Sequence, residues 1–210
     1  KHTVIEILET RDGLVKVRLD DNSRAYNIIQ NSGEVAVNDE VIVNTSAVDL
    51  NLGTGGWHFV LWNLKYESLQ TKSSGHIMKL RYSPLQFESG VAEEFEGYTN
   101  KNNIEGCSVI AAPLFSQVAP IATYIKNKKP NLKIAVVISD SASLPLAIAD
   151  LMVQLKELKL VDSTVTFGHA YGGDIEAINI FTALLSARHI AKADIIIATM
   201  GPGIVGTGTE

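Results

Sequence analysis

Residues 108–138 read SVIAAPLFSQVAPIATYIKNKKPNLKIAVVI, and this stretch decides the fold class. It holds two short apolar runs, 109–112 and 134–138, of the kind that form buried strands. Between them, residues 118–128 repeat their apolar side chains with the period of a helix. A strand, a helix and a strand in this order predict two parallel strands joined by a right-handed crossover.

The same alternation continues to the end of the chain. Helices are predicted over 144–159 and 175–190, and strands over 164–167 and 195–198. The strands are nearly all apolar, as expected where helices cover both faces of a sheet. We therefore predict an α/β domain over 106–210, with a parallel, Rossmann-like sheet and helices on both faces. The sequence leaves open whether this domain is truncated at its C-terminus.

The first sixty residues have a different pattern. Short runs such as 15–19 alternate apolar and polar side chains, and turn signals such as Asp12-Gly13 separate them. Short strands at this spacing predict a small β-barrel-like module of five or six strands over 1–65. Its boundary is left open as far as about residue 105, because residues 44–105 show no clear pattern.

Composition excludes several classes of protein. Apolar residues make up 46% of the chain and charged residues 20%, which is typical of a globular protein. A formal charge of −5 argues against a nucleic-acid partner. Cys107 is the single cysteine, so we predict no internal disulfide and no zinc site built from several cysteines, and no metal-binding residues are assigned. No apolar run is long enough to cross a membrane and no signal peptide is evident, so we expect a cytoplasmic protein without a membrane partner. The chain lacks an initial Met, and we expect it to be a fragment.

Ligands of open parallel sheets bind outside the carboxyl ends of the strands, so the loops there carry the candidate site. These loops are rich in small and polar residues. The candidate ligand-binding residues are Ser116 after the first strand; Ser139, Asp140 and Ser141 after the second; His169, Gly172 and Gly173 after the third; and Gly201, Gly203, Gly206, Thr207 and Gly208 after the fourth.

Three of these loop residues are candidates for catalysis. Asp140 follows a strand directly and either binds a ligand hydroxyl or metal, or serves as a turn or cap. His169 is either an acid–base group or a structural residue. Asp174 is predicted to cap the helix that begins at residue 175, and Glu176 would complement the helix dipole. Two carboxylates there favour a hydroxyl, an amine or a divalent cation over a phosphate.

Other signals have competing interpretations. Ser116 also fits a simple helix cap. Gly201, Gly203 and Gly206 match the GxGxxG spacing of dinucleotide sites, but they follow a fourth strand rather than a first, so the loop fits an anion cradle or a tight connection equally well. No cofactor is assigned. Lys79 and Arg81 share a face of a strand predicted over 76–82, where they either clamp an anion or form an exposed polar face.

Residues 75–86, GHIMKLRYSPLQ, together with GTGG at 53–56 and GPG at 201–203, resemble a bacterial family of unknown function. The resemblance covers the whole chain. It implies a cytoplasmic protein with a small N-terminal β domain, and further strands beyond residue 210, because members of the family are longer. It carries over no catalytic role.

Two functions remain open on these grounds. The first is a small-metabolite-binding α/β domain or enzyme, which uses its strand-end loops on a small polar or phosphorylated molecule. The second is a non-catalytic scaffold whose β module binds a partner. An exposed apolar patch around Trp57, Phe59 and Trp62 would favour the scaffold. The sequence does not decide the substrate, the reaction or whether identical chains assemble.

Overall fold

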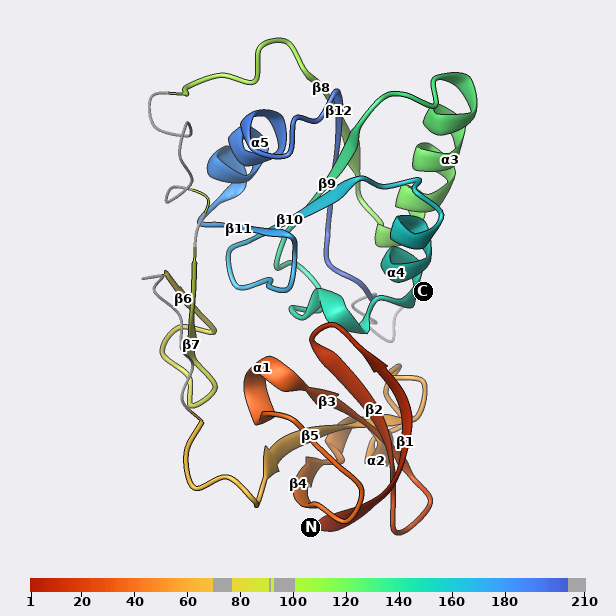
Figure 1. Cartoon of the computed structure of the whole chain (residues 1–210), viewed down its shortest axis with the longest axis vertical. Helices are drawn as coiled ribbons and strands as arrows, with labels where there is room; N and C mark the ends of the chain where they lie inside the picture. The colour runs from red at the N-terminus through yellow and green to blue at the C-terminus, as the bar shows by residue number, and fades with distance from the viewer. Residues whose placement is uncertain (70–76, 91, 93–100, 204–210) are drawn as a thin grey trace. The chain divides into compact units, whose positions relative to one another are not determined.

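The computed structural model describes residues 1–69, 77–90, 92 and 101–203. The chain divides into two compact units (Figure 1). The described residues of the first unit run from 1 to 69, and those of the second run from 77 to 203 with gaps. Among the described helices, none has both the length and the apolar character needed to cross a bilayer.

The N-terminal unit is a closed five-stranded barrel, which confirms the predicted barrel. Its strands are β1 (His2–Arg11), β2 (Leu14–Leu19), β3 (Arg24–Ile28), β4 (Glu40–Asn44) and β5 (Trp57–Asn63), in the order β1-β2-β3-β5-β4. Two four-residue helices, α1 (Ile29–Ser32) and α2 (Ser46–Asp49), flank β4 in the chain. The alternation in β2 places Val15, Val17 and Leu19 in the barrel core. β5, for which no element was predicted, closes the barrel by pairing with β3 and β4.

The C-terminal unit contains a five-stranded sheet in which all neighbouring strands are parallel, as predicted. Its strands are β8 (Ser108–Ala112), β9 (Ile134–Ile138), β10 (Ser163–Phe167), β11 (Ile175–Ala177) and β12 (Ile195–Thr199). Their order is β11-β10-β9-β12-β8. The chain thus returns from β11 to insert β12 between β9 and β8.

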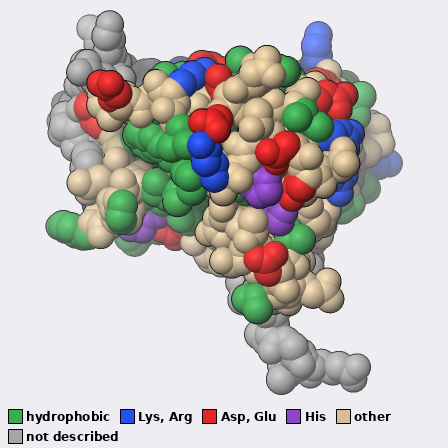
Figure 2. Space-filling view, turned by 90° about the horizontal axis from the view of Figure 1, so that it is seen from below, with side chains coloured by type: hydrophobic (Ala, Val, Ile, Leu, Met, Phe, Trp, Pro, Cys, Tyr) green, Lys and Arg blue, Asp and Glu red, His purple; other side chains and the backbone are tan. Residues whose placement is uncertain are grey.

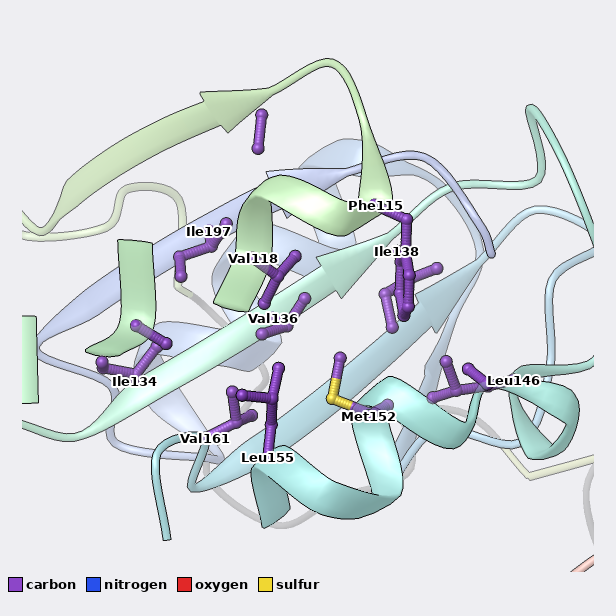
Figure 3. Close-up of a cluster of buried hydrophobic side chains, with 13 residues drawn as sticks. Phe115, Val118, Ile134, Val136, Ile138, Leu146, Met152, Leu155, Val161 and Ile197 are labelled. Atoms are coloured by element: carbon purple, nitrogen blue, oxygen red, sulfur yellow. The ribbon is translucent and has the colours of Figure 1, made fainter. Parts of the chain in front are cut away.

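Helices pack on both faces of this sheet (Figure 1). α3 (Val118–Lys128) has the predicted bounds, and it lies with α4 (Asp150–Glu157) on one face. Between them and β9, the buried side chains of Ile134, Val136 and Ile138 meet Val118 and Met152 (Figure 3). α5 (Ile180–His189) packs on the opposite face, against β9, β10 and β11.

The prediction of a helix over 175–190 is wrong for the residues before Ile180. Residues 175–177 form β11, which pairs with β10, and the helix starts only at Ile180. Asn179 caps it, since its side chain accepts a hydrogen bond of 3.0 Å from the Thr182 amide. The strand conformation lets Ile175 and Ala177 enter the core, where both are buried.

The helix predicted over 144–159 is also shorter than expected. A 3₁₀ turn over Leu146–Ile148 precedes α4, and Pro145 forms an isolated parallel bridge with Tyr171. A residue before proline is disfavoured in helical conformation, so Leu144 begins an extended segment. Its carbonyl accepts from the Tyr171 amide at 2.9 Å.

A two-stranded antiparallel hairpin precedes the sheet in the chain. It consists of β6 (Ile77–Lys79) and β7 (Phe87–Ser89). The strand predicted over 76–82 is thus too long, because Leu80 and Tyr82 adopt positive φ angles of 50° and 60°, which no strand accommodates. Residue 76 lies outside the described residues.

Candidate functional site

A pocket of about 350 Å³ opens at the carboxyl ends of the parallel strands. We call it the strand-end pocket. Its lining consists of residues 111–113 and 198–200, together with Val137, Ser139, Ser141, Phe167 and Ile180. Strands β8, β9, β10 and β12 and the start of α5 therefore all contribute to it. This is the edge at which open parallel sheets bind their ligands.

The floor of the strand-end pocket consists of two small side chains, Ala111 and Ala198, with the fully buried Val137 in register beside them. Ala198 on β12 is the register partner of Ala111 on β8 and of Val137 on β9. Residues in register on adjacent strands project from the same face, and this is the face on which α5 packs, since Val137 belongs to the α5-side core. Phe167 and Ile180 border the floor, so the pocket has a low apolar base beside one aromatic ring.

The polar groups of the pocket are hydroxyls. The Ser139 and Ser141 Oγ atoms lie 2.6 Å apart and share a hydrogen bond. Thr199 also lines the pocket, but its side chain is in register with Ala112 and Ile138 and so projects from the opposite face of the sheet, on which α3 and α4 pack. It is only 6% exposed, and its Oγ1 has no hydrogen-bond partner among the described residues. None of the described residues that line the pocket carries a charge.

The loops after β9 and β12 are bonded to each other around this site. The Ser139 amide donates to the Thr199 carbonyl at 3.0 Å, and the Ser143 amide donates to the Pro202 carbonyl at 3.1 Å. A Cβ on Gly201 would overlap the Ser143 carbonyl oxygen, so only glycine permits this approach. The predicted role of Gly201 in the site is therefore explained by packing between the two loops.

Asp140 joins two strand-end loops and does not line the pocket. Its Oδ2 accepts a 2.8 Å hydrogen bond from the backbone amide of His169. Gly168, which has a φ of 65°, lies so close that a side chain there would overlap the Asp140 carboxylate. Asp140 thus holds the loop after β10 against the loop after β9.

His169 is not paired with a carboxylate through its ring. Its Nε2 lies 3.5 Å from Nη2 of Arg81, and because arginine only donates, this nitrogen is the acceptor. Nδ1 then carries the proton, and it is buried without a partner among the described residues. Asp140 contacts the backbone of His169 and not the imidazole, so the two candidates do not form an acid–base dyad in this geometry.

Asp174 does not cap a helix, which corrects the prediction. It accepts hydrogen bonds from the Thr164 amide at 2.8 Å and from Lys156 Nζ at 2.5 Å. Burial raises the pKa of Asp174, but the bonds from Lys156 and Thr164 outweigh it and hold the pKa below its ordinary value. Thr164 stands near the start of β10, so Asp174 lies at the amino end of the sheet, away from the pocket.

Glu176 and Lys79 form a buried ion pair that the sequence interpretation missed. Lys79 is fully buried, and its Nζ lies 2.9 Å from Glu176 Oε2 and 2.8 Å from the Ala170 carbonyl. Glu176 also accepts from Thr166 Oγ1 and from the Gly172 amide, each at 2.7 Å. Burial raises the pKa of Glu176, while Lys79 acts in the opposite direction. The anion that Lys79 clamps is thus the chain's own carboxylate.

The remaining predicted ligand residues have structural positions or lie outside the description. The Gly172 amide is used by Glu176, and a Cβ on Gly173 would come within 2.8 Å of Thr166 Oγ1. Ser116 is exposed in a 3₁₀ turn, where Gln117 and not Ser116 accepts the capping bond, from the Leu114 amide. Gly203 has a φ of 102° and open space around it. Gly206, Thr207 and Gly208 lie outside the described residues.

A possible set of metal ligands in the described part of the chain is in the barrel. His2, Asp20 and Asp21 place their ligand atoms within 4.8 Å of one another. Histidine and acidic side chains lie side by side on the surface in the space-filling view (Figure 2). The His2 Nδ1 is already hydrogen-bonded to Asp20 at 2.8 Å, and the carboxylates are exposed, so this group is an ordinary hydrogen-bonded cluster on the surface.

Comparisons with known proteins place the chain in a family without giving it an activity. A family model described as protein of unknown function (DUF3866) matches residues 24–210. No curated protein and no solved structure matches the chain.

Proposed function

Because the chain belongs to this family of unknown function, we propose its function from its own geometry: the α/β unit is a Rossmann-like domain that binds a small molecule in the strand-end pocket. We take residues 106–210 as the binding domain and residues 1–65 as a separate barrel module. The parallel strand order and the helices on both faces support the Rossmann-like assignment.

The pocket is the observation that carries the proposal. Its volume of about 350 Å³ lies within the range of small-ligand sites, and it combines an apolar floor with a few hydroxyls, as such sites do. Asp140, His169 and Asp174 do not line it. Binding is therefore better supported than catalysis by these three residues.

The test is a thermal-shift screen of the chain against small polar metabolites. A ligand at a hundred times its Kd should stabilise the folded protein by about 2.7 kcal/mol. Ala111→Leu should abolish the shift, because the larger side chain would fill the floor from the exposed edge strand β8. Val109→Leu is the matched control, since Val109 lies two residues away on the same face of β8 and does not line the pocket.

Two results would contradict the proposal. One is a screen in which no compound changes the melting temperature. The other is a shift that survives Ala111→Leu undiminished, because the ligand would then bind elsewhere.

The scaffold function has less support, because the aromatic side chains of the barrel pack on one another. Trp57 stacks on Tyr26 with ring centroids 4.6 Å apart, and the Arg24 guanidinium lies 4.5 Å from the centre of the Trp57 ring. Trp62 donates from Nε1 to the Tyr66 carbonyl at 3.1 Å. Trp57, Phe59 and Trp62 are half-buried and do not form the exposed patch that a docking surface would require.

A further inference from the structure

We infer that the strand-end pocket selects an uncharged, planar ring that carries an amide-type edge. The inference rests on the proposed binding function and deepens it by naming the class of ligand. Three properties of the pocket support it, which are its charge, the shape of its floor and the hydrogen-bonding capacity of its hydroxyls.

The charge of the surroundings disfavours a phosphate or a carboxylate. No lysine, arginine or histidine is among the described lining residues. Lys79, a buried cation of this unit, is bonded to Glu176. The Asp140 carboxylate stands between Ser139 and Ser141 in the chain, and it would repel an anion bound at these serines.

The backbone around the two serines is also unsuited to an anion. Anion-binding loops present several unbonded amides to the ligand. Here the Ser139 and Ser143 amides donate to the Thr199 and Pro202 carbonyls, and the Ser141 amide faces Ser139 Oγ at 3.4 Å. Three amides of this loop are thus used within the protein.

The floor favours a flat molecule. Ala111 and Ala198 are register partners on adjacent strands, and neither has a side chain long enough to rise far above the sheet. Phe167 adds an aromatic ring beside them, and aromatic rings favour stacked or edge-on contacts with other rings. A planar ring covers such a floor with more buried apolar area than a puckered one.

The hydroxyls favour an edge that both donates and accepts. In the Ser139–Ser141 pair one hydroxyl donates to the other, which leaves one hydrogen and several lone pairs for a ligand. An amide offers a carbonyl beside an N–H and satisfies both kinds of group, whereas a carboxylate only accepts.

The test compares the affinities of benzamide, benzoate and cyclohexanecarboxamide for the whole chain. Each compound is titrated, and its binding is monitored by ligand-observed NMR. Benzamide should bind at least tenfold more tightly than benzoate, and also more tightly than the puckered cyclohexanecarboxamide. Ser139→Ala combined with Ser141→Ala should remove most of the preference for benzamide over benzoate. The Ala111→Leu variant should abolish binding of benzamide.

The possible failures are distinguishable. Equal or tighter binding of benzoate, or of cyclohexanecarboxamide, would overturn the inferred ligand class and leave the proposed binding function intact. The same holds if benzamide does not bind while other compounds of the metabolite screen do so in an Ala111-dependent way. If no compound of either set binds, the proposed function itself fails.

Discussion

Replacing Thr199 by valine should stabilise the ligand-free protein, although most substitutions of buried residues destabilise. Thr199 ends β12 and is 6% exposed, and its hydroxyl has no partner among the described residues. Valine has nearly the same shape and retains the β-branched side chain that strands prefer. The substitution therefore removes a buried polar group that makes no hydrogen bond in the absence of ligand.

The size of the effect follows from the burial. An unsatisfied buried hydroxyl costs about 1 to 3 kcal/mol, which Thr199→Val should recover in the free energy of unfolding. Thr166→Val is the matched control, because Thr166 is also buried, near the carboxyl end of β10. Its hydroxyl donates to Glu176 at 2.7 Å and accepts from the Gly173 amide at 3.0 Å. The control should therefore be destabilising by about 1 to 3 kcal/mol.

Urea unfolding monitored by two spectroscopic probes shows whether the effect arises in the α/β unit or in the barrel. Both tryptophans of the chain, Trp57 and Trp62, belong to the barrel, whereas the three longer helices belong to the α/β unit. Thr199→Val should raise the urea midpoint of the helical circular dichroism signal without changing its slope, and it should leave the tryptophan fluorescence transition in place. Destabilisation equal to that of Thr166→Val would refute the reasoning, because the Thr199 hydroxyl would then be hydrogen-bonded.

Three further predictions concern contacts within the α/β unit. Lys79→Met should lower the free energy of unfolding in urea by about 3 to 5 kcal/mol, because it leaves Glu176 buried without its cation. The control, Lys156→Met at the exposed pair with Asp174, should lower it by at most about 1 kcal/mol. Equal losses for the two variants would contradict the burial of the Lys79–Glu176 pair. Because the pKa of Asp174 is lowered in the folded protein, the stability that Asp174 contributes is present above about pH 4 and is lost as the pH falls through the lowered pKa. Asp174→Asn should therefore reduce the fall of the melting temperature at acid pH. An unchanged dependence of the melting temperature on pH would refute this prediction. Gly201→Ala should lower the melting temperature of the α/β unit because its Cβ meets a backbone carbonyl that cannot move aside, and a neutral effect would show that the loops separate readily.

Much of the fold could be predicted because its signals are local. The strands over 134–138 and 195–198 are short apolar runs, and α3 was predicted with the bounds it has in the structure. In β2, alternation alone identifies the three residues that enter the barrel core. These patterns persist over four residues or more, long enough for the period of a strand to differ from that of a helix.

The elements that were missed depend on partners distant in the chain. β11 is three residues long and cannot show a period, and it exists because it pairs with β10 and because Glu176 meets Lys79 from the hairpin. Nothing near Lys79 in sequence indicates that it is fully buried. The sequence places Pro145 in the first turn of the helix predicted over 144–159, but its bridge to Tyr171 keeps the segment extended.

Of the residues predicted for the candidate site, Ser139 and Ser141 line the strand-end pocket, and hydrogen-bond accounting explains why Asp140 and Asp174 do not. Polar residues collect at strand ends partly because the loops there have backbone amides that need acceptors. Asp140 accepts from His169 and Asp174 accepts from Thr164, so both carboxylates are already used by the protein. Ser139 and Ser141 share one hydrogen bond and retain capacity for others. In this chain, the side chains that keep hydrogen-bonding capacity at the strand ends are therefore better candidates for contact with a ligand than the carboxylates, whose capacity the protein itself uses.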